Sequence, residues 1–100
     1  MRVVWSRPAL SDVLQIRRYI AVDSLRYARV VAERIFASVD RLVEHPLSGR
    51  IVPELSEPSL REIVESPYRI VYRVRDDVVE IITVIHAARR FPAELLRPHV

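Results

Sequence analysis

Residues 68–92, YRIVYRVRDDVVEIITVIHAARRFP, hold the side chains of this sequence that are best suited to chemistry. A guanidinium group binds carboxylates and phosphates through a planar fork of donors. A histidine can transfer protons near neutral pH. The candidates are Arg69, His86, Arg89 and Arg90. Their types are compatible with an acid–base site, a docking surface for an anionic partner, or a solvated face.

Several other kinds of site are excluded or not expected. The chain has no cysteine, which removes thiol nucleophiles, disulfides and cysteine metal sites. It has no lysine for Schiff-base chemistry, because all sixteen cationic residues are arginine. His45, His86 and His99 lack the spacing of a metal site, so we expect no metal. The serines lack a nucleophile motif, and no pattern predicts a cofactor.

The composition predicts a small globular protein. One hundred residues make a single domain, half of them apolar, with interspersed charges and a formal net charge of +3. This basic surplus favours a nucleic acid or an acidic protein as partner without choosing between them. The start of the chain does not read as a signal peptide, and no stretch is long enough to span a membrane. We therefore expect a cytoplasmic protein.

The elements that must position these residues follow from periodicity and turn signals. Residues 2–5 read as a strand, and Ser6 can cap a helix with an early Pro8. Asp23 or Ser24 can cap a second helix that ends before His45. Strands are predicted at 60–65, 68–75 and 78–86, after an irregular segment. The fold class is α+β: an N-terminal strand, an antiparallel helical hairpin and a three-stranded antiparallel meander, with the helices on one sheet face.

Both helices carry apolar stripes that should pack on the sheet. In the first helix the stripe is Ala9, Val13, Ile16 and Ile20, with Leu10 and Leu14 beside it. In the second helix it is Ala28, Val31, Ala32, Ile35, Val39 and Leu42. We expect one domain over residues 1–92 and a C-terminal tail over residues 93–100.

The last two strands should form a hairpin about an Asp76–Asp77 turn. Counting outward from the turn along both strands predicts the cross-strand pairs Arg73–Glu80, Tyr72–Ile81, Val71–Ile82 and Arg69–Val84. The face under the helices would then carry Tyr68, Ile70, Tyr72, Val74, Val79, Ile81, Thr83 and Ile85. The opposite face would carry Arg69, Val71, Arg73, Arg75, Val78, Glu80, Ile82, Val84 and His86.

Three of these side chains invite specific expectations. Arg73 should pair with Glu80. Arg69 faces only valine in this register, so it forms an ion pair with Glu62 or Glu65 on the neighbouring strand, or it stays free for a phosphate or carboxylate. His86 is a satisfied, partly buried histidine, or it serves as an acid–base group or ligand.

Read in order, these segments resemble the RelE/ParE superfamily of toxins from bacterial type II toxin–antitoxin systems. The matching stretches are VVWSRPALSDVLQIRRYIA, AERIFASVDRLVEHP, LSGRIVPEL, LREIV, YRIVYRV and VEIITVIHAARRFP, which span nearly the whole chain. The resemblance implies neutralisation by a cognate antitoxin of ribbon-helix-helix type with an acidic tail, in a toxin–antitoxin hetero-oligomer. We expect Tyr27, Val30 and Phe36 to bind it, unless they merely pack at the edge of the helical hairpin.

Two subfamilies imply different functions. RelE-like members cleave mRNA on the ribosome and need cations with an acid–base residue, for which Arg61, Arg69 and His86 are candidates here. No tyrosine follows Tyr72, however, and Phe91 stands where a phenol is expected.

ParE-like members inhibit DNA gyrase by binding, and the ending HAARRFP and the segment GRIVPEL are similar to theirs. We therefore expect a ParE-like binding toxin rather than an enzyme. The ribosome-dependent endoribonuclease is the alternative. The residues expected to bind the target are Arg69, His86, Arg89, Arg90 and Phe91.

Overall fold

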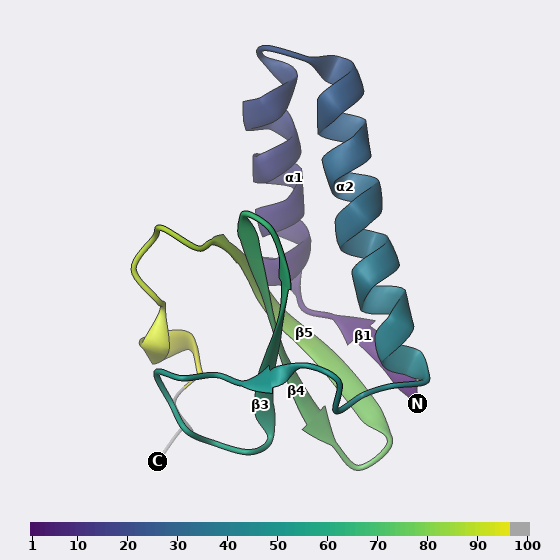
Figure 1. The fold of residues 1–100 in the computed structure, drawn as a ribbon, viewed down its shortest axis with the longest axis vertical. Helices are drawn as coiled ribbons and strands as arrows, with labels where there is room; N and C mark the ends of the chain where they lie inside the picture. Colours follow the sequence, from purple (N-terminus) through teal and green to yellow (C-terminus); the bar gives the residue numbers. More distant parts are fainter. Residues whose placement is uncertain (97–100) are drawn as a thin grey trace.

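The fold is a helical hairpin packed on one face of a five-stranded sheet, as seen in a computed structural model that describes residues 1–96 (Figure 1). The strand order is β1-β5-β4-β3-β2. The elements are β1 Arg2–Trp5, α1 Arg7–Ala21, α2 Leu25–Asp40, the 3₁₀ turn η1 Arg41–Val43, β2 Arg50–Ile51, β3 Leu60–Glu65, β4 Tyr68–Arg75, β5 Val78–His86 and the 3₁₀ turn η2 Ala93–Leu95. The α+β class and the order of the elements agree with the prediction.

Both helices begin at a serine cap. The Ser6 hydroxyl accepts a hydrogen bond from the backbone N–H of Ala9 at 3.1 Å, and Pro8 lies in the first turn of α1, where its missing N–H costs nothing. The Ser24 hydroxyl accepts from the N–H of Tyr27 at 3.0 Å. Ser24, rather than Asp23, is therefore the cap of α2.

The stripe predicted for the second helix is buried at all six positions, five of them in α2 and the sixth, Leu42, in η1. In α1, Ala9 and Val13 are buried, Ile16 and Ile20 are half-buried, and the flanking leucines are exposed. These side chains pack on the helix-facing residues of the sheet, which include Ile70, Tyr72, Val79, Ile81 and Val84. This cluster is the main core.

The predicted register of the β4–β5 hairpin is confirmed only as far as Tyr72–Ile81, because a bulge interrupts the ladder there. Beyond it, Val71 pairs with Thr83 and Arg69 with Ile85, so the predicted pairs Val71–Ile82 and Arg69–Val84 are wrong. Because β5 has one extra residue at the bulge, the residues of β5 after it face the opposite side of the sheet from the one predicted.

Val84 consequently joins the helix-facing core, and Ile85 joins the opposite face, which exchanges their predicted positions. His86, also assigned to the opposite face, lies across from Tyr68, a member of the helix-facing core.

Two short strands extend the predicted meander on either side. β1 pairs in parallel with β5, from Arg2–Val78 to Trp5–Ile81, and β2 pairs with β3 through Arg50–Glu62. Among residues 1–96, no helix has the length and apolar character needed to cross a membrane.

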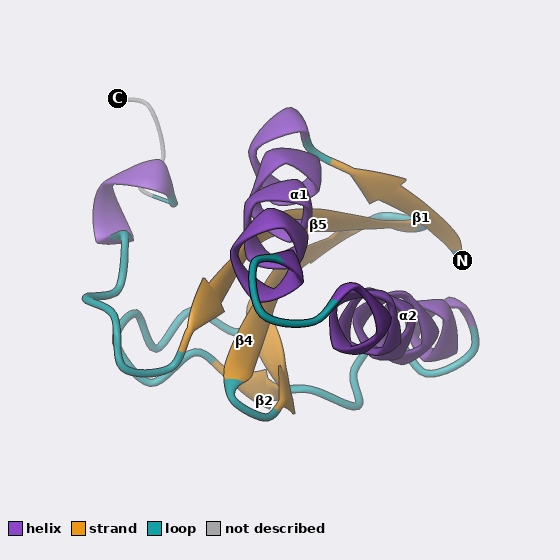
Figure 2. Cartoon of the chain, turned by 90° about the horizontal axis from the view of Figure 1, so that it is seen from above, coloured by secondary structure: helices purple, strands orange, loops and turns teal. Residues whose placement is uncertain are grey.

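The face away from the helices has its own apolar cluster, formed by Val52, Leu60, Val71, Ile82, Ile85, Phe91 and Leu96. The chain after β5 crosses this face, so that η2 lies on the far side of the strands from α2 (Figure 2). Residues 93–96 of the expected C-terminal tail thus lie close to the sheet. Residues 97–100 fall outside the described part of the chain.

Candidate functional site

Arg69 is buried, and it lies in a cluster of charged side chains rather than on an open surface. Its Nε donates to Glu62 Oε1 at 2.7 Å, and its two terminal nitrogens donate to the two carboxylate oxygens of Glu54 at 2.8 and 2.7 Å. The ring of Phe91 lies 4.9 Å from the guanidinium carbon, within cation–π range. The sequence left Arg69 either in an ion pair with Glu62 or Glu65 or free for a phosphate or carboxylate. The structure shows the ion pair with Glu62.

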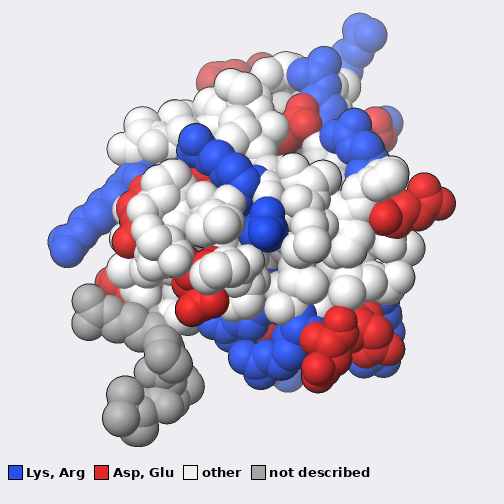
Figure 3. All heavy atoms as spheres, turned by 60° about the horizontal axis from the view of Figure 1, so that its bottom comes forward, with Lys and Arg blue, Asp and Glu red and all other residues white. Residues whose placement is uncertain are grey.

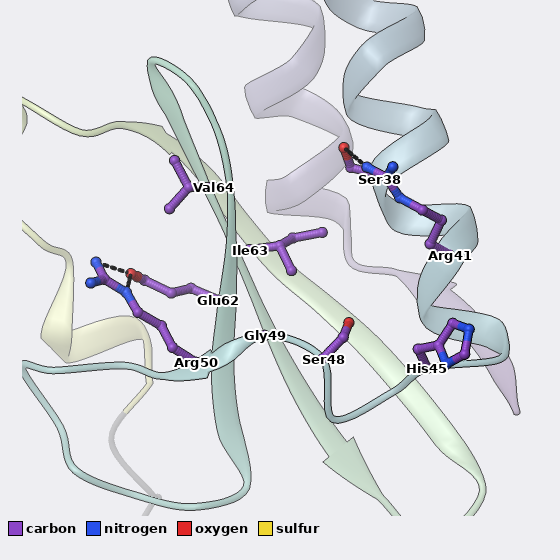
Figure 4. Close-up of a pocket in the computed structure, with 9 residues that line it drawn as sticks. All are labelled: Ser38, Arg41, His45, Ser48, Gly49, Arg50, Glu62, Ile63 and Val64. Carbon is purple, nitrogen blue, oxygen red and sulfur yellow. Dashed lines mark hydrogen bonds and ion pairs between the residues drawn. The ribbon is translucent and has the colours of Figure 1, made fainter.

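A second arginine completes the cluster. Glu62 is fully buried, and its other oxygen accepts from Nε of Arg50 at 2.6 Å (Figure 4). The hydrogen bond from Arg69 lowers the pKa of Glu54, and the same bond raises the pKa of Arg69 further. Two carboxylates therefore compensate two guanidinium groups, and little positive charge is left for a phosphate.

Arg61, the second cation proposed for a nuclease, holds the loop before β2. Its Nη1 donates to the carbonyl oxygens of Gly49 at 3.0 Å and Leu47 at 3.4 Å. The Tyr72 hydroxyl accepts from the N–H of Gly49 at 2.9 Å. A side chain at Gly49 would collide with this hydroxyl and with a carbonyl oxygen of β3, which explains the glycine.

His86 is exposed, and so less covered than the partly buried position expected from the sequence. Its Nδ1 accepts from the N–H of Ala88 at 3.0 Å, and its ring meets the edge of Tyr68 at a centroid distance of 5.6 Å. Burial raises the pKa of Tyr68. A groove of about 550 Å³ runs beside them between α1 and the end of β5, and Tyr19 and Arg89 also line it.

The floor of this groove is fixed by Asp12 of α1. One carboxylate oxygen of Asp12 accepts from the Thr83 hydroxyl at 2.6 Å and from the N–H of Val84 at 3.0 Å. These bonds satisfy backbone and side-chain donors next to the bulge of β5. Sequence reasoning missed Asp12 and Glu54, because neither has a recognisable spacing to the groups that it binds.

The three residues proposed for RNA cleavage do not come together. His86 packs against Tyr68 beside the groove, whereas Arg69 packs against Phe91 on the opposite face of the sheet. Arg61 is engaged with the loop before β2. In the described part of the chain, no three histidine or acidic side chains are grouped closely enough to hold a metal ion.

The residues expected to bind the target divide into two groups. His86, Arg89 and Arg90 are exposed at the end of β5, whereas Arg69 and Phe91 are buried. Arg73 lies opposite Glu80 as predicted, but its guanidinium donates to the carbonyl oxygen of Leu96 at 3.4 Å. The face drawn in Figure 3 carries separate groups of basic and of acidic side chains with uncharged surface between them.

A second groove, of about 480 Å³, lies between the end of α2 and β3 (Figure 4). It is lined by Ser38, Arg41, His45, Ser48, Gly49, Arg50, Glu62, Ile63 and Val64. β2 covers only the first part of the β3 edge, so within residues 1–96 the backbone from Ile63 to Glu65 has no strand partner on that side. Such an edge can accept a strand from another chain.

The residues expected to bind the antitoxin lie along α2. Tyr27 is half exposed and Val30 is half-buried. Phe36 remains 40% exposed although its ring packs against Trp5 in a tilted arrangement, at a centroid distance of 5.1 Å. Packing at the hairpin edge and a surface left for a partner therefore coexist at Phe36.

Comparison with known proteins identifies the family. Residues 3–91 match the family model described as the ParE toxin of the type II toxin–antitoxin system parDE. The chain belongs to the ParE toxin family. As a ParE-family chain, it is the toxin type of a two-component system whose second member is an antitoxin.

Individual relatives agree with this assignment. Toxin RelE2 of Caulobacter vibrioides is 42% identical over 89 residues, which cover 88% of this chain and 97% of the relative. The putative toxin Y4kP of Sinorhizobium fredii is 42% identical over 96 residues, which cover 94% of this chain and 96% of the relative. A solved structure, the chromosomal ParDE TA system from P. aeruginosa, has a TM-score of 0.71 at 23% identity over 86% of this chain and 95% of that one. The last likeness concerns the fold alone.

Proposed function

We propose that this ParE-family protein arrests growth in the cytoplasm by binding DNA gyrase, without cleaving a bond itself. Family membership supports a toxin, and the arrangement of the side chains supports a binding mechanism. The observation that carries the proposal is the separation of Arg61, Arg69 and His86 into three environments. Cleavage through a ribose hydroxyl needs charge stabilisation and proton transfer at one point.

A ribosome-dependent endoribonuclease is the second candidate. It is suggested by the name of the Caulobacter relative, RelE2, and by the exposed position of His86. In that case His86 would have to work without Arg69, whose guanidinium is already bound to two carboxylates.

Purified toxin distinguishes the two candidates. We expect it to inhibit supercoiling by gyrase and to accumulate cleaved DNA, while ribosome-bound mRNA stays intact. Intact gyrase activity together with cut mRNA that is lost in His86→Ala would reverse the assignment. Wild-type antitoxin affinity in the His86→Ala variant would show that the variant is folded.

We propose that the arginines at the end of β5 contact the target. A double variant, Arg89→Glu with Arg90→Glu, should relieve growth arrest without lowering the melting temperature. The control reverses two exposed arginines elsewhere, Arg34→Glu and Arg75→Glu, with the same change of net charge. Equal loss of toxicity in both variants would mean that overall charge, not this position, matters.

The antitoxin, in our proposal, is of ribbon-helix-helix type with an acidic tail, and it forms a hetero-oligomer with the toxin. It covers Tyr27, Val30 and Phe36 and continues to the open edge of β3, where Arg41 and Arg50 line the groove. Co-purification with the protein of the neighbouring reading frame tests this. Phe36→Glu should abolish rescue by the antitoxin, whereas Leu47→Glu, at another exposed apolar position, should not.

A further inference from the structure

The last residues of α1, the first residues of α2 and the connection between them expose large apolar side chains; we call this region the hairpin tip and define it as residues 17–29. It forms the top of the molecule in Figure 1, at the opposite end from the N-terminus. Tyr19, Val22 and Leu25 are 80%, 83% and 78% exposed, the highest values among the large apolar residues that the structure describes. Single exposed apolar side chains are ordinary, but three within seven residues at one protruding end form a patch.

The hairpin tip also carries the surplus charge of the whole chain. It holds four exposed arginines, Arg17, Arg18, Arg26 and Arg29, against one acidic residue, Asp23. This surplus of three equals the net charge of the full sequence, so the other twelve arginines are balanced by twelve acidic residues. The ion pairs recorded among residues 1–96 involve other arginines.

The fold does not require this charge. The first turn of α2 has no acidic residue, and Arg26 lies next to the positive end of the helix dipole, where a cation is unfavourable. The apolar residues that the hairpin needs for packing, Ala28 and Ile20, lie on its inner side. Arg18 is the exception, because it lies in the last turn of α1, where a cation is favourable. The other exposed basic side chains and the exposed apolar side chains therefore contribute little to stability.

The hairpin tip is continuous with the proposed target surface. Tyr19 lines the same groove as His86 and Arg89, at the end of β5. The edge of β3, which we assign to the antitoxin, belongs to the other groove, beside the opposite end of α2. Tyr27, which we assign to the antitoxin, also lies within residues 17–29, but Tyr19 lines the groove on the target side. Position thus places the exposed side chains of Tyr19, Val22 and Leu25 with the target rather than with the antitoxin.

We propose that the hairpin tip inserts into a concave, acidic surface of the target protein. This inference deepens the proposed binding function and rests on it, because it names the element that grips the target. A protruding end buries its apolar side chains best in a hollow, and the surrounding guanidinium groups pair with carboxylates at the rim. Phosphates alone would give no reason to expose Val22 and Leu25, and an anionic membrane would repel Asp23 at the apex.

The test uses a triple variant, Tyr19→Ser with Val22→Ser and Leu25→Ser, in the full-length chain. Its control is Val43→Ser with Leu47→Ser, which removes exposed apolar side chains elsewhere. The triple variant should need about tenfold more toxin than wild type to inhibit gyrase, and it should no longer arrest growth at equal expression. Its melting temperature and its co-purification with the antitoxin should match those of wild type.

The outcomes separate this inference from the gyrase proposal. If wild type arrests growth without any effect on gyrase, gyrase is not the target. The growth assay with the triple variant would then still test whether the hairpin tip binds the target. Full toxicity of the triple variant would discard the tip alone. Toxicity that the antitoxin no longer rescues would assign the tip to the antitoxin instead. If wild type, but not the triple variant, binds phosphatidylglycerol vesicles or linear DNA, the partner of the tip is a membrane or a nucleic acid and not a protein. If wild type does not arrest growth, both proposals are wrong.

Discussion

Replacing Arg69 by alanine tests whether the buried charge cluster holds the sheet together. The change leaves Glu62, whose side chain is fully buried, with Arg50 as its remaining cation, and Arg50 is 61% exposed. Removing one partner of a buried pair typically costs about 3–5 kcal/mol, and the contact with Phe91 is lost as well. Because Arg50 still compensates part of the negative charge of Glu62, we expect a loss at the low end of this range, about 3 kcal/mol in the free energy of unfolding.

The assay is urea unfolding monitored by circular dichroism, supported by thermal melting. A loss of about 3 kcal/mol corresponds to a fall in Tm of roughly 12–24 °C for a domain of this size. The matched control is Glu54→Ala, since Glu54 is 40% exposed and its removal leaves the pair Arg69–Glu62 intact. Solvent screening should keep that loss below about 1 kcal/mol.

A double variant separates stability from recognition. Arg69→Met combined with Glu62→Met replaces the buried pair by apolar side chains and should restore stability to within about 1 kcal/mol of wild type. If this folded variant also arrests growth, Arg69 is not a target contact. A loss below about 1 kcal/mol in Arg69→Ala would refute the reasoning, because the guanidinium would then be free to serve a target.

Three further predictions follow from individual contacts. Gly49→Ala should destabilise the protein by about 1–3 kcal/mol in urea unfolding, because the added carbon would lie 2.6 Å from the Tyr72 hydroxyl; wild-type stability would contradict this. Asp12→Ala should cost about 1–3 kcal/mol by leaving the Thr83 hydroxyl and a neighbouring backbone donor unpaired, and faster amide hydrogen exchange near the bulge should accompany it. Because burial raises the pKa of Tyr68 above 10.0, its contribution to stability is complete below pH 10.0 and is lost as the pH rises through the folded value. Unfolding measured against pH should show this loss in wild type and less of it in Tyr68→Phe.

Local signals predicted most of the fold. The serine caps, the six buried positions of α2 and η1, and the two-residue turn at Asp76 each depend on residues close together in the chain. The strand pairs next to the turn follow for the same reason. Short-range chemistry decides these features, so the sequence is sufficient to predict them.

What the sequence could not predict depends on contacts between distant segments. The bulge in β5 is stabilised by Asp12, seventy-one positions from Thr83, and no turn residue marks it. It reverses the faces of Val84 and Ile85. Glu54 reaches Arg69 from an irregular segment that has no periodicity to count along. The sequence therefore suggested candidate site residues by their chemical type, but it could not predict which residues would be their neighbours in the fold.

The parallel pairing of β1 with β5 affects how the chain matures during synthesis. The first strand that leaves the ribosome must wait for residues 78–81 before its ladder can form. Until then β5, which lies between β1 and β4 in the sheet, is missing, and the nascent chain lacks the scaffold that presents a finished toxin surface. A cell translating this message therefore has until β5 has been synthesised to supply the antitoxin.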